Sequence, residues 1–200
     1  MDSTVQRRLI EEVANVVIRH AAELTTLDQA IGDGDHGLNM KRGATAILER
    51  LDELAAKPLP DALKAAGQTL VMKVGGASGP LYGTLLMTLG KELPNAPDQD
   101  DLVRAIGAAI EAVKKIGRSD VGQKTMLDVL GPVHEELALG GRELLDRARR
   151  RSSTAADATV PMKAIKGRAS FLGERSIGHM DPGARSASLM IAAVCSVMEE

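Results

Sequence analysis

The sequence predicts an all-α fold of about eight helices, and three observations support this prediction. Aromatic residues make up only 1% of the 200-residue chain, so residues that favour sheets are scarce, whereas alanine, leucine and methionine, which favour helices, are abundant. Apolar residues recur at a period near 3.6 almost throughout the chain. The hydrophobic fraction of 44% is large enough to bury a sizeable core.

The helices are predicted in order from this periodicity. The first follows a stripe of apolar side chains that begins at Val5 and continues to Leu24. The others are expected at about residues 39–54, 60–74, 79–92, 98–116, 125–139, 141–158 and 183–198. The last helix follows Asp181 and Pro182, a capping carboxylate before a proline at the first helical position. It is apolar on nearly all sides, so we expect it in the interior of the bundle.

The connections between these helices predict a single domain that spans residues 1–200. Pro58 and Pro60, and later Pro94 and Pro97, mark connections that are too short to be domain linkers. Connections of this length join antiparallel neighbours in helical bundles. No internal repeat is evident at the periods typical of solenoids.

Composition and charge exclude several functional classes. The formal net charge is -2, which does not favour nonspecific attraction to nucleic acid or to an anionic membrane. The sequence contains no apolar run of membrane-spanning length and no secretory signal, so a cytoplasmic protein is expected. The single cysteine, Cys195, lies in an apolar run and is expected to be a core residue rather than a catalytic thiol.

The first segment that breaks the helical pattern spans residues 28–37 and carries three carboxylates. Asp28, Asp33 and Asp35 would be spread around a continuous helix, but a turn at Gly32 and Gly34 can bring them together. Magnesium prefers hard oxygen ligands and commonly takes a few carboxylates together with substrate phosphates. An acidic loop that merely caps the next helix is the weaker interpretation, because three converging carboxylates repel one another without a cation. The segment therefore predicts a site for one or two magnesium ions beneath a polyphosphate.

Three familiar motifs are rejected. The glycines of residues 32–37 match a dinucleotide-binding pattern, but they follow a helix where that pattern requires a strand. A calcium-binding EF-hand would place Ala44 where a bidentate glutamate is needed. Residues 117–125 are similar to a P-loop, but Lys124 falls one place late and no strand precedes it.

Two helix starts carry candidate phosphate contacts. His36 and Asn39 follow the acidic segment at the beginning of a helix, where unpaired N–H groups face a bound anion. That they merely satisfy the helix end is about equally consistent with the sequence. Ala77 and Ser78 precede another helix in a glycine-rich turn and would present N–H groups and a hydroxyl to a second phosphate.

Two further residues are candidates on chemical grounds. Arg168 could stabilise the charge that develops on a transferred phosphoryl group, or it could form a structural ion pair with Glu174. The sequence does not decide between these alternatives. Because the chain has almost no aromatic residues, a purine would need aliphatic and thioether surfaces, and Met126 is a candidate for one of these.

Four sequence blocks together closely resemble one known family, the DhaL subunits of dihydroxyacetone kinases. These blocks are IGDGDHGLNMKRG, GGASGPLYGT, KTMLDV and KGRASFLGERSIGHMDPGA, which occur in the family's order between Asp28 and Ala184. The resemblance implies an antiparallel barrel of eight helices with the nucleotide site in loops at one end. It also implies that two magnesium ions and ADP or ATP are the cofactors.

The resemblance further assigns site residues. It implies that Asp28, Asp33 and Asp35 bind the magnesium ions and that Arg168 is catalytic. The nucleotide contacts that it implies are His36, Gly37, Leu38, Asn39, Ala77, Ser78, Gly117, Met126, Arg168, Asp181, Pro182 and Gly183.

Two partners are implied in the same way. A DhaK-type subunit would hold dihydroxyacetone, and a DhaM-type protein of the phosphotransferase system would rephosphorylate the bound ADP. The alternatives are a subunit of an ATP-dependent kinase for a related small ketose and a nucleotide-binding regulator without catalytic activity.

Overall fold

The computed structural model describes residues 2–199, and this part of the chain is helical without a strand, as predicted. Two predicted helices are divided and one short helix was not predicted. The elements are α1 (Ser3–Arg19), α2 (Ala21–Ile31), α3 (His36–Leu48), α4 (Leu51–Ala55), α5 (Leu59–Lys73), α6 (Ser78–Glu92), α7 (Gln99–Gly117), α8 (Leu127–Leu139), α9 (Leu144–Ala158), the 3-10 helix η1 (Arg168–Ser176) and α10 (Pro182–Met198).

Both divisions occur where the chain turns without losing its apolar period. The first predicted helix breaks at His20, whose backbone leaves the helical region, with φ -96° and ψ 9°. The helix predicted at 39–54 breaks at Arg50, whose guanidinium reaches across to the carbonyl of Ala65 in α5. The apolar stripe continues through both breaks, so periodicity alone does not reveal them.

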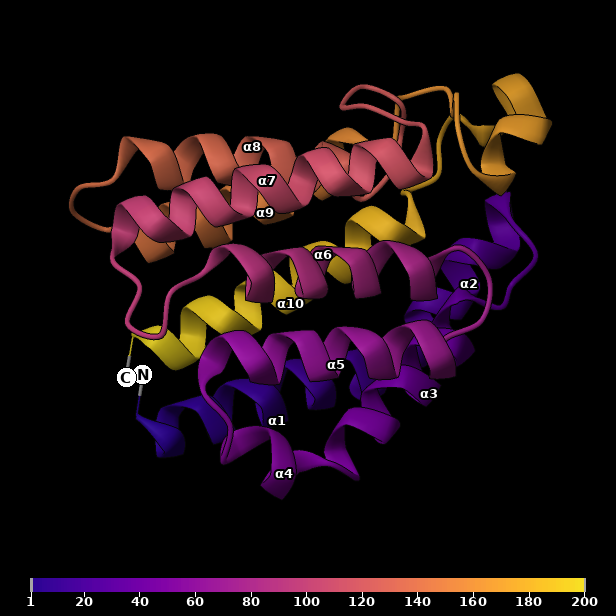
Figure 1. Ribbon diagram of the computed structural model, residues 1–200. Coiled ribbons are helices and arrows are strands. Elements are labelled where there is room, and N and C mark those ends of the chain that lie inside the picture. Colours follow the sequence, from indigo (N-terminus) through magenta and orange to yellow (C-terminus); the bar gives the residue numbers. More distant parts are fainter. Residues whose placement is uncertain (1, 200) are drawn as a thin grey trace.

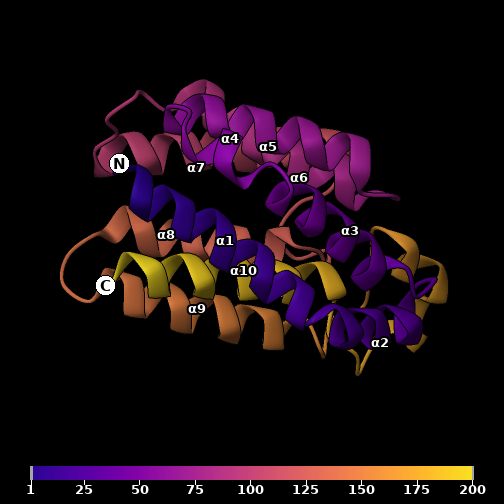
Figure 2. The same cartoon turned by 90° about the horizontal axis from the view of Figure 1, so that it is seen from below.

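Eight of the helices pack in a closed ring. In order around the ring, each contacts the next: α1, α3, α5, α6, α7, α8, α9 and α10, and α10 contacts α1 again. Figures 1 and 2 show these helices running roughly side by side, with α2, α4 and η1 outside the ring. The expected antiparallel barrel of eight helices is therefore confirmed.

The interior of the ring is filled by small and aliphatic side chains. Leu24, Leu127 and Val129 are fully buried, and Cys195 is buried among them as expected. Truncating a buried leucine in such a core typically costs about 2–5 kcal/mol. Helix α10 forms part of the ring between α9 and α1, and Val194 near its end is 39% exposed, so the helix does not lie in the interior of the bundle as expected.

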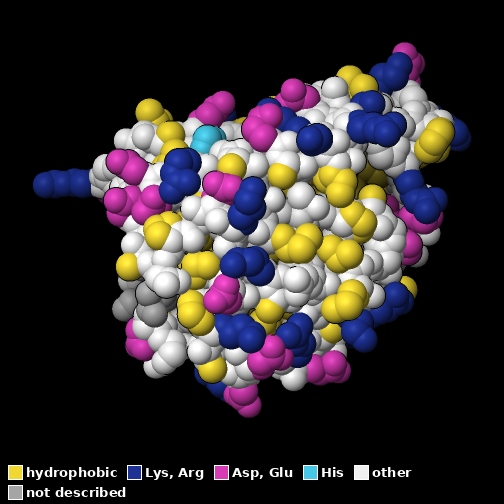
Figure 3. All heavy atoms as spheres, viewed as in Figure 1, with side chains coloured by type: hydrophobic (Ala, Val, Ile, Leu, Met, Phe, Trp, Pro, Cys, Tyr) yellow, Lys and Arg dark blue, Asp and Glu magenta, His cyan; other side chains and the backbone are white. Residues whose placement is uncertain are grey.

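The polar loops gather at one end of the barrel. The segments 32–35, 74–77, 118–126 and 159–181 all lie at the end where α2 finishes and η1 stands, while α1 begins and α10 finishes at the opposite end (Figure 1). Apolar side chains show among the charged ones on the face that Figure 3 presents. No helix of residues 2–199 is both long enough and apolar enough to cross a membrane.

Candidate functional site

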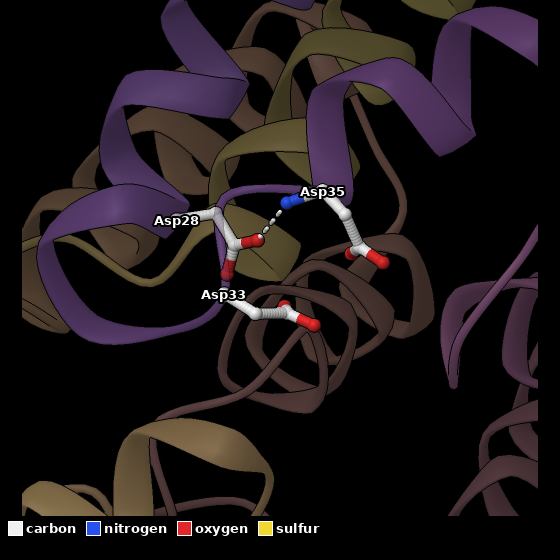
Figure 4. Close-up of side chains that lie close together, drawn as sticks. All are labelled: Asp28, Asp33 and Asp35. Atoms are coloured by element: carbon white, nitrogen blue, oxygen red, sulfur yellow. Dashed lines mark hydrogen bonds between the residues drawn. The ribbon is translucent and has the colours of Figure 1, made fainter.

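The three aspartates of the first loop converge. Asp28 lies in the last turn of α2, and Asp33 and Asp35 follow in the loop that leads to α3. One carboxylate oxygen of each lies within 4.8 Å of the others, and Figure 4 shows the three side chains facing one region. Asp28 is buried, whereas Asp33 reaches solvent. The predicted convergence of the carboxylates is thus observed, and their binding of magnesium stays a prediction.

Asp28 also holds this loop in its folded shape. Its Oδ2 accepts hydrogen bonds from the backbone N–H groups of Asp35, at 2.9 Å, and of His36, at 3.0 Å. Gly34 adopts the left-handed region with φ 76°, which residues with a side chain rarely adopt. A Cβ at Gly32 would lie 2.0 Å from Asp28 Oδ1, so only glycine fits beside this carboxylate. The two glycines therefore allow the turn, and Asp28 fastens it.

The charge of the cluster is only partly balanced by the protein. Arg168 on η1 places its Nη2 3.1 Å from Asp33 Oδ2, and its side chain is 67% exposed. Three carboxylates beside one exposed guanidinium leave excess negative charge, which a divalent cation with a preference for oxygen ligands would neutralise. The residues present therefore fit magnesium. The alternative pairing of Arg168 with Glu174 is not the one observed.

Three helices begin beside this cluster. His36 at the start of α3 places Nδ1 3.0 Å from Oγ of Ser78, the first residue of α6, and Nε2 3.0 Å from Oγ of Ser186 in the first turns of α10. The N–H groups of a helix start are unpaired and carry partial positive charge, so converging starts favour an anion. Burial lowers the pKa of His36, against the opposing effect of the carboxylates of Asp28 and Asp35.

The second glycine-rich turn packs onto the first loop through Asn39. Asn39 is buried, and a Cβ at Gly75 would lie 2.8 Å from its Oδ1. The neighbouring Gly76 has a φ of 65°, which again favours glycine. Ala77 is exposed and Ser78 is half-buried, so solvent reaches both residues.

Two residues next to His36 differ in their surroundings. Gly37 is buried against α2, where a Cβ would lie 2.0 Å from the carbonyl oxygen of Ala21. Its lack of a side chain therefore serves the close approach of α3 to α2. Leu38 is 60% exposed at the same end of the barrel.

Further predicted nucleotide contacts lie at the same end of the barrel, where α7 ends and α8 and α10 begin. Met126 is buried, and its backbone nitrogen lies 3.5 Å from where a Cβ of Gly183 would be. Gly117, at the end of α7, has Leu81 of α6 3.3 Å from the position of its own Cβ. Pro182 is buried in the first turn of α10. Residues far apart in sequence thus meet at one end of the barrel.

Asp181 caps α10 as predicted, since its Oδ2 accepts the N–H of Ala184 at 2.7 Å. Burial raises the pKa of Asp181 to about 7, with the carboxylate of Asp128 acting in the same direction and Lys124 in the opposite one. A carboxyl with this pKa changes its charge near neutral pH.

Lys124 has a role that sequence reasoning missed. It is only 1% exposed, and its Nζ donates to the carbonyl oxygens of Met162, at 2.9 Å, and Ser176, at 2.6 Å. Its backbone is left-handed, with φ 63°. Lys124 therefore ties the loop before α8 to the loop that carries η1. No sequence signal marks it, because lysine side chains are almost always exposed.

A cleft adjoins the metal-binding candidates. It is lined by Ile31, Gly32, Asp33, Arg168, Phe171 and Leu172. Phe171 is 89% exposed at the mouth of this cleft. Arg168 thus lies between the acidic loop and open solvent.

Comparisons with known proteins agree with this geometry. The sequence model of the DAK2 domain family matches residues 30–196 of this chain. The chain is 47% identical over 172 residues to the ADP-binding subunit DhaL of PEP-dependent dihydroxyacetone kinase 1 from Listeria innocua, and the match covers 86% of this chain and 84% of that protein. It is 40% identical over 185 residues to the ADP-binding subunit DhaL of PEP-dependent dihydroxyacetone kinase from Escherichia coli, with 88% of each chain covered.

A solved structure is similar as well. The dihydroxyacetone kinase of C. freundii in complex with AMP-PNP and Mg²⁺ superposes with a TM-score of 0.79 at 26% identity. The match covers 96% of this chain and 34% of that one, so this chain corresponds to about a third of the solved enzyme.

Proposed function

The chain belongs to the DAK2 domain family, and from this membership we propose that it is the ADP-binding subunit of a dihydroxyacetone kinase. In this role it is a phosphotransferase subunit that holds a magnesium-bound nucleotide and delivers the terminal phosphoryl group to dihydroxyacetone. The whole chain, residues 1–200, acts as one nucleotide-binding domain. The closed ring supports this, because its first and last helices, α1 and α10, are neighbours.

The observation that carries the proposal is the convergence of three carboxylates beside three helix starts. Asp28, Asp33 and Asp35 would hold two magnesium ions, which supply positive charge that neutralises the phosphates. The side chains of His36, Ser78 and Ser186 join the starts of α3, α6 and α10 beside these carboxylates. Negative ligands and positive helix starts in one site suit a metal-bound polyphosphate better than either ion alone.

The remaining candidates divide between phosphates and nucleoside. His36, Asn39, Ala77 and Ser78 lie nearest the carboxylates and would contact the phosphates, together with the backbone of residues 36–39. The nucleoside would lie against the other wall of this end. The candidates on that wall are Gly117, Met126, Asp181, Pro182 and Gly183.

Arg168 is the catalytic candidate. In the reaction, a hydroxyl oxygen of dihydroxyacetone attacks the γ-phosphorus, the bond to the bridging oxygen of ADP breaks, and the hydroxyl proton passes to a base. The exposed guanidinium of Arg168 can reach from Asp33 to the transferred group and stabilise its charge.

The base and the sugar site are assigned to a partner of the DhaK type. At this end of the barrel Asp28 accepts two backbone N–H groups and Asp33 pairs with Arg168, while His36 is buried with both ring nitrogens engaged by serines. Exposed apolar side chains border the site, namely Leu38, Met72, Phe171 and Ile177. An apolar rim of this kind around a charged site favours docking of another protein subunit.

The phosphoryl donor is assigned to a DhaM-type protein that rephosphorylates ADP without its release. The names of the relatives support this assignment, because they describe PEP-dependent kinases with an ADP-binding subunit. ADP then behaves as a resident cofactor rather than as a released product.

Reconstitution tests the proposal. The purified chain is mixed with a DhaK-type subunit and dihydroxyacetone, and the donor is either a phosphorylated DhaM-type protein or ATP. Formation of dihydroxyacetone phosphate that requires this chain, with slow exchange of bound ADP against labelled ATP, is the expected result. Transfer at equal rates from ATP with rapid exchange would contradict the DhaM assignment, and no transfer with either donor would contradict the kinase function.

A further inference from the structure

Tyr82, Ser186, His36 and Ser78 form a largely buried chain of hydrogen bonds that ends at the proposed nucleotide site, and helix α6 joins the two ends of this chain into a ring. Ser186 Oγ lies 3.0 Å from His36 Nε2 and 2.7 Å from the hydroxyl oxygen of Tyr82. On the other side of the imidazole, His36 Nδ1 lies 3.0 Å from Ser78 Oγ. Ser78 and Tyr82 are four residues apart on α6, so they lie on the same face of that helix and close the ring.

The ring joins the starts of three helices. His36 is the first residue of α3, Ser78 is the first of α6, and Ser186 lies one turn into α10. The carbonyl oxygen of Gly183, in the first turn of α10, lies 3.2 Å from the hydroxyl oxygen of Tyr82 and 3.1 Å from that of Ser186, so it can accept a hydrogen bond from either. The ring therefore fixes α3, α6 and α10 relative to one another at the end that carries the site.

Most members of the ring are closed to solvent. Ser186 is fully buried, Tyr82 is 4% exposed and His36 is 8% exposed, whereas Ser78 is half-buried, so solvent reaches it. Buried hydroxyl groups are costly unless each finds a partner, so such a network is rigid when all its members are paired. Ser78 is the member of the network that can contact a ligand, so the network affects the ligand through Ser78.

The donor and acceptor roles of the groups in this ring depend on one another. A neutral imidazole has one donor nitrogen and one acceptor nitrogen, so one of the two serines donates to His36 and the other accepts from it. The hydroxyl of Tyr82 biases which role Ser186 takes, and Ser186 in turn biases His36. The orientation of the Ser78 hydroxyl, donating to the ring or free to donate to a phosphate, is therefore coupled to Tyr82, although Tyr82 lies deeper in the barrel.

We propose that Tyr82 and Ser186 are positioning residues for the nucleotide phosphates, acting through His36 to hold Ser78 in place. This inference rests on the proposed function, because it assumes that the phosphates lie at Ser78. It assigns a role in binding to two side chains that are separated from the ligand by one or two intervening groups.

The test compares hydroxyl deletions inside and outside the ring. Tyr82→Phe and Ser186→Ala each remove one hydroxyl from it. The control is Ser188→Ala, which removes a buried hydroxyl from the same helix, where Ser188 Oγ lies 3.3 Å from Ser152 Oγ. Titration of ADP in Mg²⁺ should show the dissociation constant raised about three- to tenfold by either ring variant, a change typical for one hydrogen bond, and unchanged in the control.

A double-mutant cycle separates positioning from a general structural effect. If Tyr82 acts through Ser78, then Tyr82→Phe leaves ADP affinity unchanged when it is added to a Ser78→Ala variant. If Tyr82 only stabilises the fold, the effects of the two substitutions on the free energy of ADP binding add. Such additivity would overturn the inference. The nitrogen chemical shifts of the His36 ring give an independent signature without nucleotide: we expect them to change in Tyr82→Phe and not in Ser188→Ala.

The result expected if the proposed function is wrong differs from the result expected if only the positioning role is wrong. Wild-type protein that does not bind ADP in Mg²⁺ would overturn the proposed function and the positioning role with it. Wild-type protein that binds ADP, alongside ring variants that bind it equally well, would overturn the positioning role alone. Should Ser186→Ala fail to fold, Tyr82→Phe decides the result.

Discussion

Nη2 of Arg168 lies 3.1 Å from Oδ2 of Asp33, so the residue proposed to act on the phosphoryl group is paired with a proposed metal ligand. The pair connects η1 to the loop after α2 across the mouth of the site. We expect a cation bound at Asp33 to compete with the guanidinium for the same carboxylate, which would free Arg168 for the phosphates. Metal binding and placement of the arginine would then be linked.

We first predict that Arg168→Gln lowers the rate of phosphoryl transfer to dihydroxyacetone by about a thousandfold or more, as is typical for an arginine that stabilises transferred phosphoryl charge. ADP affinity should change less than tenfold, because the carboxylates and helix starts remain. Single-turnover transfer and ADP titration measure the two effects. Arg175→Gln, on the same 3-10 helix, is the control. Equal losses of rate and affinity would contradict a role confined to the transfer step.

The second prediction distinguishes two carboxylates of the acidic loop. Asp33→Ala should abolish tight ADP binding yet leave the folding stability of the metal-free protein unchanged or higher, because it removes a repelling charge. Asp28→Ala should abolish binding and also cost about 1–3 kcal/mol, because two buried N–H groups lose their acceptor. Denaturant unfolding in EDTA and ADP titration test this, with Asp100→Ala, on the exposed start of α7, as the control. Unchanged ADP binding by Asp33→Ala would refute its role as a metal ligand.

The third prediction concerns pH. Burial raises the folded-state pKa of Asp181 to about 7 from its ordinary value of 3.8, so between these values the folded protein holds a proton that the unfolded chain has lost. Stability from this group is therefore lost as pH rises from about 4 to 7. Asp181→Asn keeps the capping oxygen and removes the charge, so its stability relative to wild type should increase over this window by roughly 2–4 kcal/mol. Asp98→Asn, at the exposed cap of α7, should show no such trend in parallel unfolding curves.

Lys124 supports a fourth prediction. Lys124→Met keeps the length of the side chain but removes its two hydrogen bonds to main-chain carbonyls, so it should destabilise the protein by about 2–4 kcal/mol. Amide exchange should accelerate in residues 159–178, which Lys124 ties down. The exposed Lys163→Met, in the same loop, should change stability by less than about 0.5 kcal/mol. Protection unchanged in residues 159–178 would show that Lys124 is not the tie.

The parts of the fold that follow from local patterns were predictable. The helix expected at 60–74 is α5 (Leu59–Lys73), and the cap at Asp181 is formed as expected, because both depend on residues close together in sequence. The breaks at His20 and Arg50 were not, because they leave the apolar stripe intact and depend on contacts made after folding. The short helix η1 was not predicted for a similar reason: it lacks helical periodicity and packs on α2.

The candidate site was likewise predictable only where it depends on residues close together in sequence. The three aspartates could be predicted to converge because they lie within eight residues around a glycine turn. Tyr82 and Ser186 could not be paired from sequence, since they are 104 residues apart and hydroxyl groups carry no spacing pattern. The one available signal was that Tyr82 is the single tyrosine of the chain.

Titration of ADP into the wild-type protein, with Mg²⁺ and then with EDTA, is the most direct test of a magnesium-dependent nucleotide site. We predict tight binding with Mg²⁺ and loss of that binding in EDTA, because the carboxylates repel the phosphates unless a cation lies between them. Equal affinity in the two solutions, or no binding in either, would contradict a nucleotide site built on Asp28, Asp33 and Asp35.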